Sequence, residues 1–292
     1  MRRGINPRIV IGAFRIDNSA PPLYALGMAD AIPAALRGLI DDAAVFPPGN
    51  AALEDAVPAH RGYRASWYAP IVGPLLVPAS RAADLNPGRS DLDIGLIVDI
   101  EPERVEAAVA ALAGRARVVQ FESRAALDSP DIARSWSSRV FAEIPIGDEN
   151  ALDAAAEYGF APKFRTGGLV AEAFPTPEGL AGAIAGCARR GLRFKLTAGL
   201  HHAIRRRDPE TGFTHHGFLN VLVASGEAAS GADIDSVARQ LASTDAADLA
   251  QRARTLLDWP RPLWTAYGSC SIDEPVADLI ELKLLERGAA AS

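Results

Sequence analysis

Two short stretches decide the fold: "KFRTGG" (residues 163–168) and "FKLTAG" (residues 194–199). Each has the short apolar run and the terminal glycine that are typical of a β-strand entering a turn. Each also carries a lysine inside the run, Lys163 in the first and Lys195 in the second. A charged side chain in the interior of a sheet is costly unless it is paired, so these strands need explaining.

The alternation of side chains along a strand assigns each residue of the two stretches to a face. Phe164, Phe194 and Leu196 are in one phase and are expected to face the helices. The two lysines, Arg165 and Thr197 are in the other phase and are expected to point into the centre of a closed sheet.

The rest of the chain repeats the same unit, a β-like run followed by an Ala-, Leu- and Arg-rich helical stretch. Strands that alternate with helices predict a parallel sheet, and eight such units predict a (β/α)₈ TIM-like barrel. An open doubly wound α/β sheet is the alternative. The eight runs are 38–46, 73–80, 93–100, 117–123, 139–146, 162–168, 193–199 and 262–271.

Three segments need separate interpretation. The helical pattern after the first run contains Pro58, which predicts a kinked or split helix. The long connection 200–261 contains "FLNVLVA", which we interpret as a helix rather than another strand. Residues 1–27 lack the pattern and are expected to be a loose extension, with a single barrel domain over 28–292. Either Met1 or Met28 can be the natural start.

Composition limits the class of protein. The 292 residues are 49% hydrophobic with a net charge of −6, and their basic residues are scattered, so no nucleic-acid partner is expected. No apolar run has transmembrane length and no signal peptide is evident, so we expect no membrane partner. Two cysteines without metal-type spacing favour a reducing compartment, hence a cytoplasmic protein. A homo-oligomer is compatible with the sequence.

Active sites of such barrels lie at the carboxyl ends of the strands. There the sequence places Lys163, Lys195 and Arg165, with Glu122 and Glu143 on the two preceding strands as counter-charges. Neighbouring cations in a pocket of low dielectric constant lower the pKa of a lysine and make it nucleophilic. One hypothesis is therefore an imine-forming enzyme in which the glutamates move protons.

A second hypothesis is a divalent metal, Mg²⁺ or Zn²⁺, that stabilises an enolate. Asp99, Glu122 and Glu143 end three successive strands and offer the oxygen ligands that Mg²⁺ prefers. His201 and His202 follow the seventh run and are expected to close the site as acid–base groups or zinc ligands.

Glycines and hydroxyls at the strand ends predict substrate-binding groups, including a phosphate site after the last two strands. Asp41 or Asp42 in "DDAAVF" is a ligand or a base, or caps a helix or turn. Cys270 is expected to be a packed, inert thiol, because nothing in the sequence pairs it with a histidine. The substrate-binding candidates are Arg165, Thr166, Gly167, Gly168, Thr197, Gly199, Gly268 and Ser269.

Together these patterns predict a lyase or isomerase that acts on a small anionic metabolite, a carboxylate or a phosphate ester, through an imine or an enolate. The alternative is a barrel that binds a ligand without turnover and whose buried charges are structural.

Overall fold

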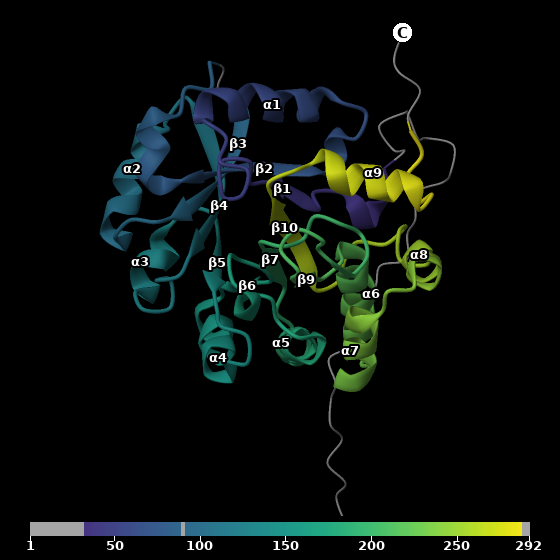
Figure 1. The fold of residues 1–292 in the computed structure, drawn as a ribbon. Helices are drawn as coiled ribbons and strands as arrows, with labels where there is room; N and C mark the ends of the chain where they lie inside the picture. The colour runs from purple at the N-terminus through teal and green to yellow at the C-terminus, as the bar shows by residue number, and fades with distance from the viewer. Residues whose placement is uncertain (1–31, 89–90, 288–292) are drawn as a thin grey trace, which may run out of the picture. The chain divides into compact units, whose positions relative to one another are not determined.

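The computed structural model describes residues 32–88 and 91–287, which contain a closed barrel of eight parallel strands (Figure 1). The order around the barrel is β1-β10-β7-β6-β5-β4-β3-β2, so the open sheet is wrong and the barrel is confirmed. Every predicted run overlaps one strand. The strands are β1 (Ile40–Asp42), β2 (Val72–Pro78), β3 (Leu92–Val98), β4 (Ala116–Ser123), β5 (Arg139–Glu143), β6 (Ala161–Arg165), β7 (Phe194–Thr197) and β10 (Trp264–Ser269).

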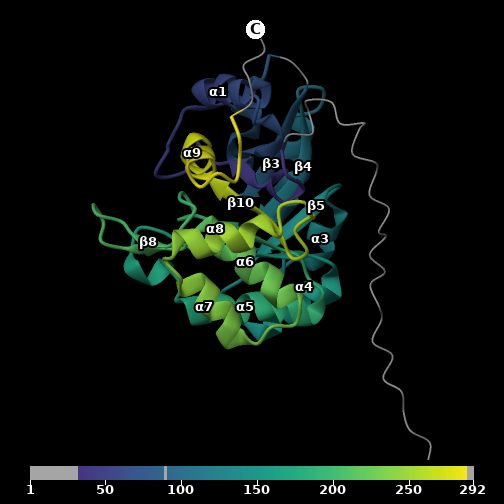
Figure 2. The same ribbon diagram turned by 90° about the vertical axis from the view of Figure 1, so that its right-hand side faces the viewer.

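Helices cover the outside of the barrel, and the connection after β7 supplies three of them. This connection holds a small exposed hairpin and then α6, α7 and α8, which pack on one another beside α5 (Figure 2). The predicted extension 1–27 lies outside the described residues. The helices are α1 (Leu53–Ala65), α2 (Val105–Ala111), α3 (Pro130–Ser135), α4 (Glu149–Tyr158), α5 (Pro177–Arg190), α6 (Phe218–Ala229), α7 (Ile234–Ala242), α8 (Ala246–Arg254) and α9 (Asp273–Glu281), and the hairpin is β8 (Arg206–Arg207) with β9 (Thr214–His215).

Local sequence signals explain where α5 begins and ends. The Thr176 side chain accepts a hydrogen bond from the backbone N–H of Gly179, and Pro177 occupies the first turn. Gly191 ends the helix with a φ of 64°, in the left-handed region that glycine tolerates. The helix therefore starts beside the carboxyl end of β6 and directs its N-terminus toward the barrel mouth.

Two predictions about helices have different outcomes. "FLNVLVA" lies in α6, as predicted, and its residues are buried on nearly all sides. Pro58 was predicted to kink or split the first helix, and it does not split it, because α1 runs across it from Leu53 to Ala65. Ala56, Val57 and His60 on this helix are buried, and this tertiary packing offsets the hydrogen bond that proline cannot donate.

The hydrophobic core lies between the outer face of the barrel and the helices. Phe164, Phe194 and Leu196 are fully buried in it, and the two phenylalanine rings have centroids 6.1 Å apart. The predicted phase of both strands is therefore confirmed, and the side chains of opposite phase point into the barrel. No described helix is both long and apolar enough to cross a bilayer.

Candidate active site

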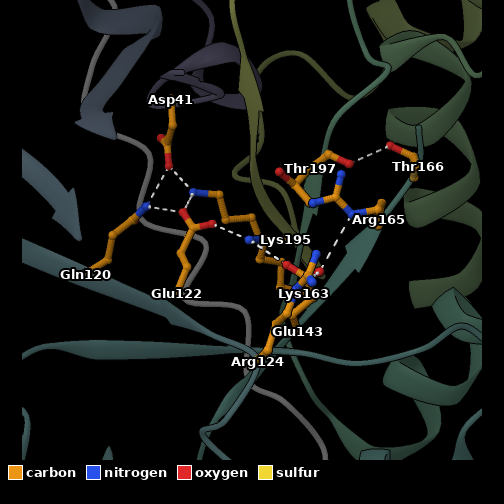
Figure 3. Close-up of polar contacts among 10 residues, drawn as sticks. All are labelled: Asp41, Gln120, Glu122, Arg124, Glu143, Lys163, Arg165, Thr166, Lys195 and Thr197. Atoms are coloured by element: carbon orange, nitrogen blue, oxygen red, sulfur yellow. Dashed lines mark hydrogen bonds and ion pairs between the residues drawn. The ribbon is translucent and has the colours of Figure 1, made fainter. Parts of the chain in front are cut away.

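The interior of the barrel holds a chain of charged groups (Figure 3). Lys195 Nζ contacts Asp41 Oδ2 and Glu122 Oε1. Lys163 Nζ lies 2.9 Å from Glu122 Oε2 and 3.0 Å from Glu143 Oε2. Glu122 thus bridges the two lysines, and we call these five residues the charge network.

The charge network joins strands that are not neighbours. Lys195 on β7 reaches β1 and β4, although β10 lies between β7 and β1. Such contacts are possible only through the barrel interior. Lys195 is fully buried and the side chain of Lys163 is 6% exposed, so the network has a deep end at Lys195 and an outer end at Lys163.

Small residues on β2 and β3 make room for the deep end. Gln120 Nε2 donates hydrogen bonds to Asp41 Oδ2 at 2.7 Å and to Glu122 Oε1 at 3.1 Å. A Cβ at Gly73 would lie 2.0 Å from Asp41 Oδ1, and one at Gly95 would lie 2.9 Å from Gln120 Nε2. Glycine at these two positions therefore lets the polar side chains fit inside the barrel.

The network fixes the protonation of its deep members. Burial alone would raise the pKa of Glu122, but Lys163 and Lys195 outweigh it and lower that pKa to about 2. Burial would lower the pKa of Lys195, but Asp41 and Glu122 outweigh it and raise that pKa. The prediction that a neighbouring cation would lower the pKa of this lysine is therefore wrong, because the carboxylates lie closer.

The two remaining carboxyls differ from each other. Burial raises the pKa of Asp41 in spite of its contact with Lys195. Burial also acts to raise the pKa of Glu143, but Lys163 outweighs it and the pKa is lowered. Asp41 is thus the deep carboxylate that most readily accepts a proton, and Glu143 stays ionised beside Lys163.

An open pocket of about 680 Å³ lies over the carboxyl ends of β5 and β6, and Glu143 is the member of the network that lines it. Glu143, Arg165 and Arg124 line it, together with Thr176 and Gly179 at the start of α5. Arg124 Nε donates to Glu143 Oε1 at 2.9 Å, and Arg165 Nε lies 3.6 Å from the same atom. A ligand in this pocket would meet two guanidinium groups and two carboxylates, Glu172 and the Glu143 that contacts Lys163.

The predicted metal ligands are not gathered. Asp99 accepts hydrogen bonds from the backbone N–H and the hydroxyl of Ser80, at 2.8 and 2.5 Å, at the end of β3. Glu122 and Glu143 are instead engaged by lysines. Within the described ranges, no three His, Cys, Asp or Glu side chains are placed to hold a metal ion. This donor set does not fit Mg²⁺ or Zn²⁺, because ammonium groups occupy the positions of the metal.

The "TGG" and "TAG" turns pack against each other. Thr166 N–H donates to Thr197 O at 2.9 Å and its hydroxyl donates to Ala198 O at 2.6 Å. A Cβ at Gly167 would lie 2.8 Å from the Cα of Gly199, so both glycines permit close backbone approach. A Cβ at Gly168 would likewise lie 2.7 Å from the Cβ of Ala173 in the following loop. This packing accounts for these predicted substrate-binding glycines.

The two predicted phosphate-binding residues Gly268 and Ser269 end β10 and are engaged in different contacts. Gly268 pairs in register with Thr197. A Cβ added at Gly268 would lie inside the barrel, 3.7 Å from the hydroxyl oxygen of Thr197. The Ser269 hydroxyl donates to Ser271 O at 2.7 Å in the turn toward α9. Ser269 therefore stabilises a turn, and Gly268 widens the barrel interior.

The two predicted histidines face α9 and the end of β10. His201 Nδ1 lies 3.0 Å from Glu274 Oε2, and His202 Nδ1 lies 3.2 Å from Asp278 Oδ2. His201 Nε2 lies 3.8 Å from Cys270 Sγ, a pairing that the sequence did not indicate. Between them the two histidines thus contact residues of α9 and the end of β10, and neither lines the pocket over β5 and β6.

Sequence reasoning named Asp41 only in general terms and left Gln120 and Arg124 out of the site. The glycines at 73 and 95, each inside an apolar strand, were an available signal of close approach. A stronger signal is that the chain has only three lysines, and two of them are in the charge network. The third, Lys283, is exposed.

Comparison with known proteins leaves the family open. No family model matches the chain, and no curated protein is significantly similar in sequence. One solved structure, described as "QR15, an Aldolase", aligns with a TM-score of 0.49 and 11% identity, over 85% of this chain and 97% of that one. At this TM-score the likeness says nothing about the activity of this chain.

Proposed function

We propose that this protein is a lyase-type enzyme in which Lys163 forms an imine with a small carbonyl compound that carries an anionic group. The observation that supports it is the contact of Lys163 Nζ, at 3.0 Å, with Glu143 Oε2, because Glu143 is the carboxylate of the network that lines the open pocket. Lys195 is too deeply enclosed for a ligand to reach and is held as an ammonium ion.

Imine formation needs a proton acceptor beside the lysine. Glu143 Oε2 lies 3.0 Å from Lys163 Nζ and borders the pocket, so it can take the ammonium proton as Nζ attacks the carbonyl carbon. A second proton passes from Nζ to the former carbonyl oxygen to give the carbinolamine, and the Glu143 carboxyl then protonates its hydroxyl, which leaves as water. An iminium ion at Nζ carries the same charge as the resting ammonium, and Glu122 at 2.9 Å remains to stabilise it.

The iminium acts as an electron sink for the carbon next to it. Loss of a proton, or cleavage of a carbon–carbon bond, at that carbon gives an enamine without a free carbanion. On the deep side of the network, Lys195 holds Glu122 in place and is itself paired with Asp41. Arg165 and Arg124 at the pocket wall would hold the carboxylate or phosphate of the substrate, because a guanidinium binds both in a bidentate manner.

One feature favours a second candidate, a barrel that binds a ligand without turnover. Each lysine in the network contacts two carboxylates, an arrangement that structural ion-pair networks also have. The two candidates differ in what happens to the carbon-bound protons of a bound carbonyl compound.

Hydrogen–deuterium exchange at the α-carbon tests the proposal. The protein is incubated in D₂O with acetaldehyde, acetone, pyruvate or dihydroxyacetone phosphate, and loss of the α-proton signal is followed by NMR. We expect exchange above the buffer rate with at least one compound, and a loss of about a hundredfold or more in Lys163→Met. A chelator is expected to change nothing.

The matched control is Lys283→Met, which removes the exposed lysine and should leave the exchange rate intact. Binding of these compounds without any catalysed exchange would favour the non-catalytic barrel. Exchange that survives Lys163→Met and stops with a chelator would support a metal-stabilised enolate instead.

A further inference from the structure

A second cluster of reactive groups lies where β7 and β10 end, separate from the pocket over β5 and β6. Cys270 directly follows β10, His201 lies in the connection after β7, and Glu274 is in the first turn of α9. Cys270 Sγ is 3.8 Å from His201 Nε2, and His201 Nδ1 is 3.0 Å from Glu274 Oε2. Three segments thus bring a thiol, an imidazole and a carboxylate into line.

This order is that of an activated nucleophile: a base within reach of the nucleophile and a third group that orients the base. The hydrogen bond to Glu274 places the Nδ1 side of the imidazole on the carboxylate and leaves Nε2 for the sulfur. Cys270 is partly exposed, whereas the other cysteine, Cys187, is fully buried in α5. The two thiols are thus in opposite environments.

We propose that Cys270, His201 and Glu274 form a second nucleophilic site, which adds the thiol to the carbonyl carbon of a small aldehyde. The thiol proton passes to His201 Nε2 and Sγ bonds to the carbonyl carbon. The carbonyl π electrons move to oxygen, which takes the proton back from Nε2. The product is a thiohemiacetal, and no oxidant or reductant is consumed. The choice of an aldehyde rests on the proposed function, but the activation of the thiol does not.

The charge around His201 agrees with this assignment. The hydrogen bond with Cys270 raises the pKa of His201 to about 9 against the effect of burial, and Glu274 adds to the rise. The raised pKa makes the imidazole a stronger base, which favours transfer of the proton from Sγ to Nε2 in the proposed step. By contrast, burial raises the pKa of Cys187 to about 12.

Alkylation by iodoacetamide, followed for each cysteine by peptide mass spectrometry, tests the activation of the thiol. We expect Cys270 to react about tenfold or more faster than the thiol of glutathione at pH 7.5, and Cys187 to remain unlabelled in the folded protein. His201→Asn should slow the labelling of Cys270 about tenfold and Glu274→Gln a few-fold. The matched control is His202→Asn, because His202 contacts Asp278 instead. It should leave the rate unchanged.

The aldehyde is tested by protection in the Lys163→Met background, where no imine can form at the proposed lysine. Propionaldehyde should slow the labelling of Cys270 and propan-1-ol should not. Circular dichroism confirms that each variant is folded, and His201→Gln serves as a second variant. A Cys270 rate equal to that of glutathione, or one unchanged in both His201 variants, would overturn the site. Rapid, His201-dependent labelling without protection by the aldehyde would overturn the carbonyl assignment alone.

Discussion

Removal of Lys195 should destabilise the protein much more than removal of Lys163, although the two side chains are chemically identical. Lys195→Met leaves Asp41 and Glu122 facing each other, both almost fully buried. The Asp41 carboxylate then keeps the hydrogen bond from Gln120 Nε2 at 2.7 Å but no cationic partner in the network. Breaking a buried ion pair in this way costs about 3–5 kcal/mol, because an uncompensated charge remains in a medium of low dielectric constant.

Lys163→Met should cost less, about 1–2 kcal/mol. Glu122 keeps its contact with Lys195. Glu143 has a side chain 15% exposed to solvent and keeps Arg124 at 2.9 Å and Arg165 at 3.6 Å. The predicted difference between the two variants is therefore about 1–4 kcal/mol, with Lys195→Met the more destabilised.

Urea unfolding followed by circular dichroism measures both costs, provided that the dependence on urea is unchanged between variants. A double variant, Asp41→Asn with Lys195→Met, removes the isolated carboxylate and should recover about half of the loss. Equal costs for the two lysines, or a loss below about 1 kcal/mol for Lys195→Met, would refute the distinction between a deep and an outer end.

Three further predictions concern the same network. Gly73→Ala should destabilise the protein by about 1–3 kcal/mol in the same unfolding assay, because the added Cβ would lie 2.0 Å from Asp41 Oδ1; an unchanged urea midpoint would contradict the packing. The pKa of Glu122, lowered from 4.5 to about 2, contributes stability that is present above pH 4.5 and lost as the pH falls toward 2. At about 1.4 kcal/mol for each pH unit this amounts to about 3 kcal/mol. In Glu122→Gln the free energy of unfolding should change less with pH between 4.5 and 2 than it does in the parent protein, and an equal change in the two proteins would contradict the assignment. Glu143→Gln should slow α-proton exchange about a hundredfold with little loss of stability, and an unchanged rate would exclude Glu143 as the proton carrier.

The barrel could be predicted from the sequence because its signals are local. Each strand is a short apolar run, and phase alone assigned Lys163 and Lys195 to the interior and Phe164 and Phe194 to the helices. These inferences need only the two-residue period of a strand. The predicted pairing of the lysines with Glu122 and Glu143 is confirmed by contacts across the barrel.

The partners within the network could not be ranked from the sequence, because side chains from five strands meet at distances that depend on the closed sheet. Asp99 and Glu122 both lie at strand ends. Asp99 accepts hydrogen bonds from Ser80, whereas Glu122 forms ion pairs with two lysines. Lys195 was expected to lose its proton readily. Two carboxylates reach it instead, one of them from β1, more than 150 residues earlier in the chain.

Covalent trapping tests the central claim most directly. The protein is mixed with each carbonyl compound, reduced with sodium borohydride and digested, and the added mass is located by peptide mass spectrometry. With only three lysines in the chain, every possible site is distinguishable. We predict the adduct at Lys163, above the labelling of exposed Lys283 and absent from Lys195. An adduct at Lys195, or labelling confined to Lys283, would contradict the assignment of Lys163 as the imine-forming residue.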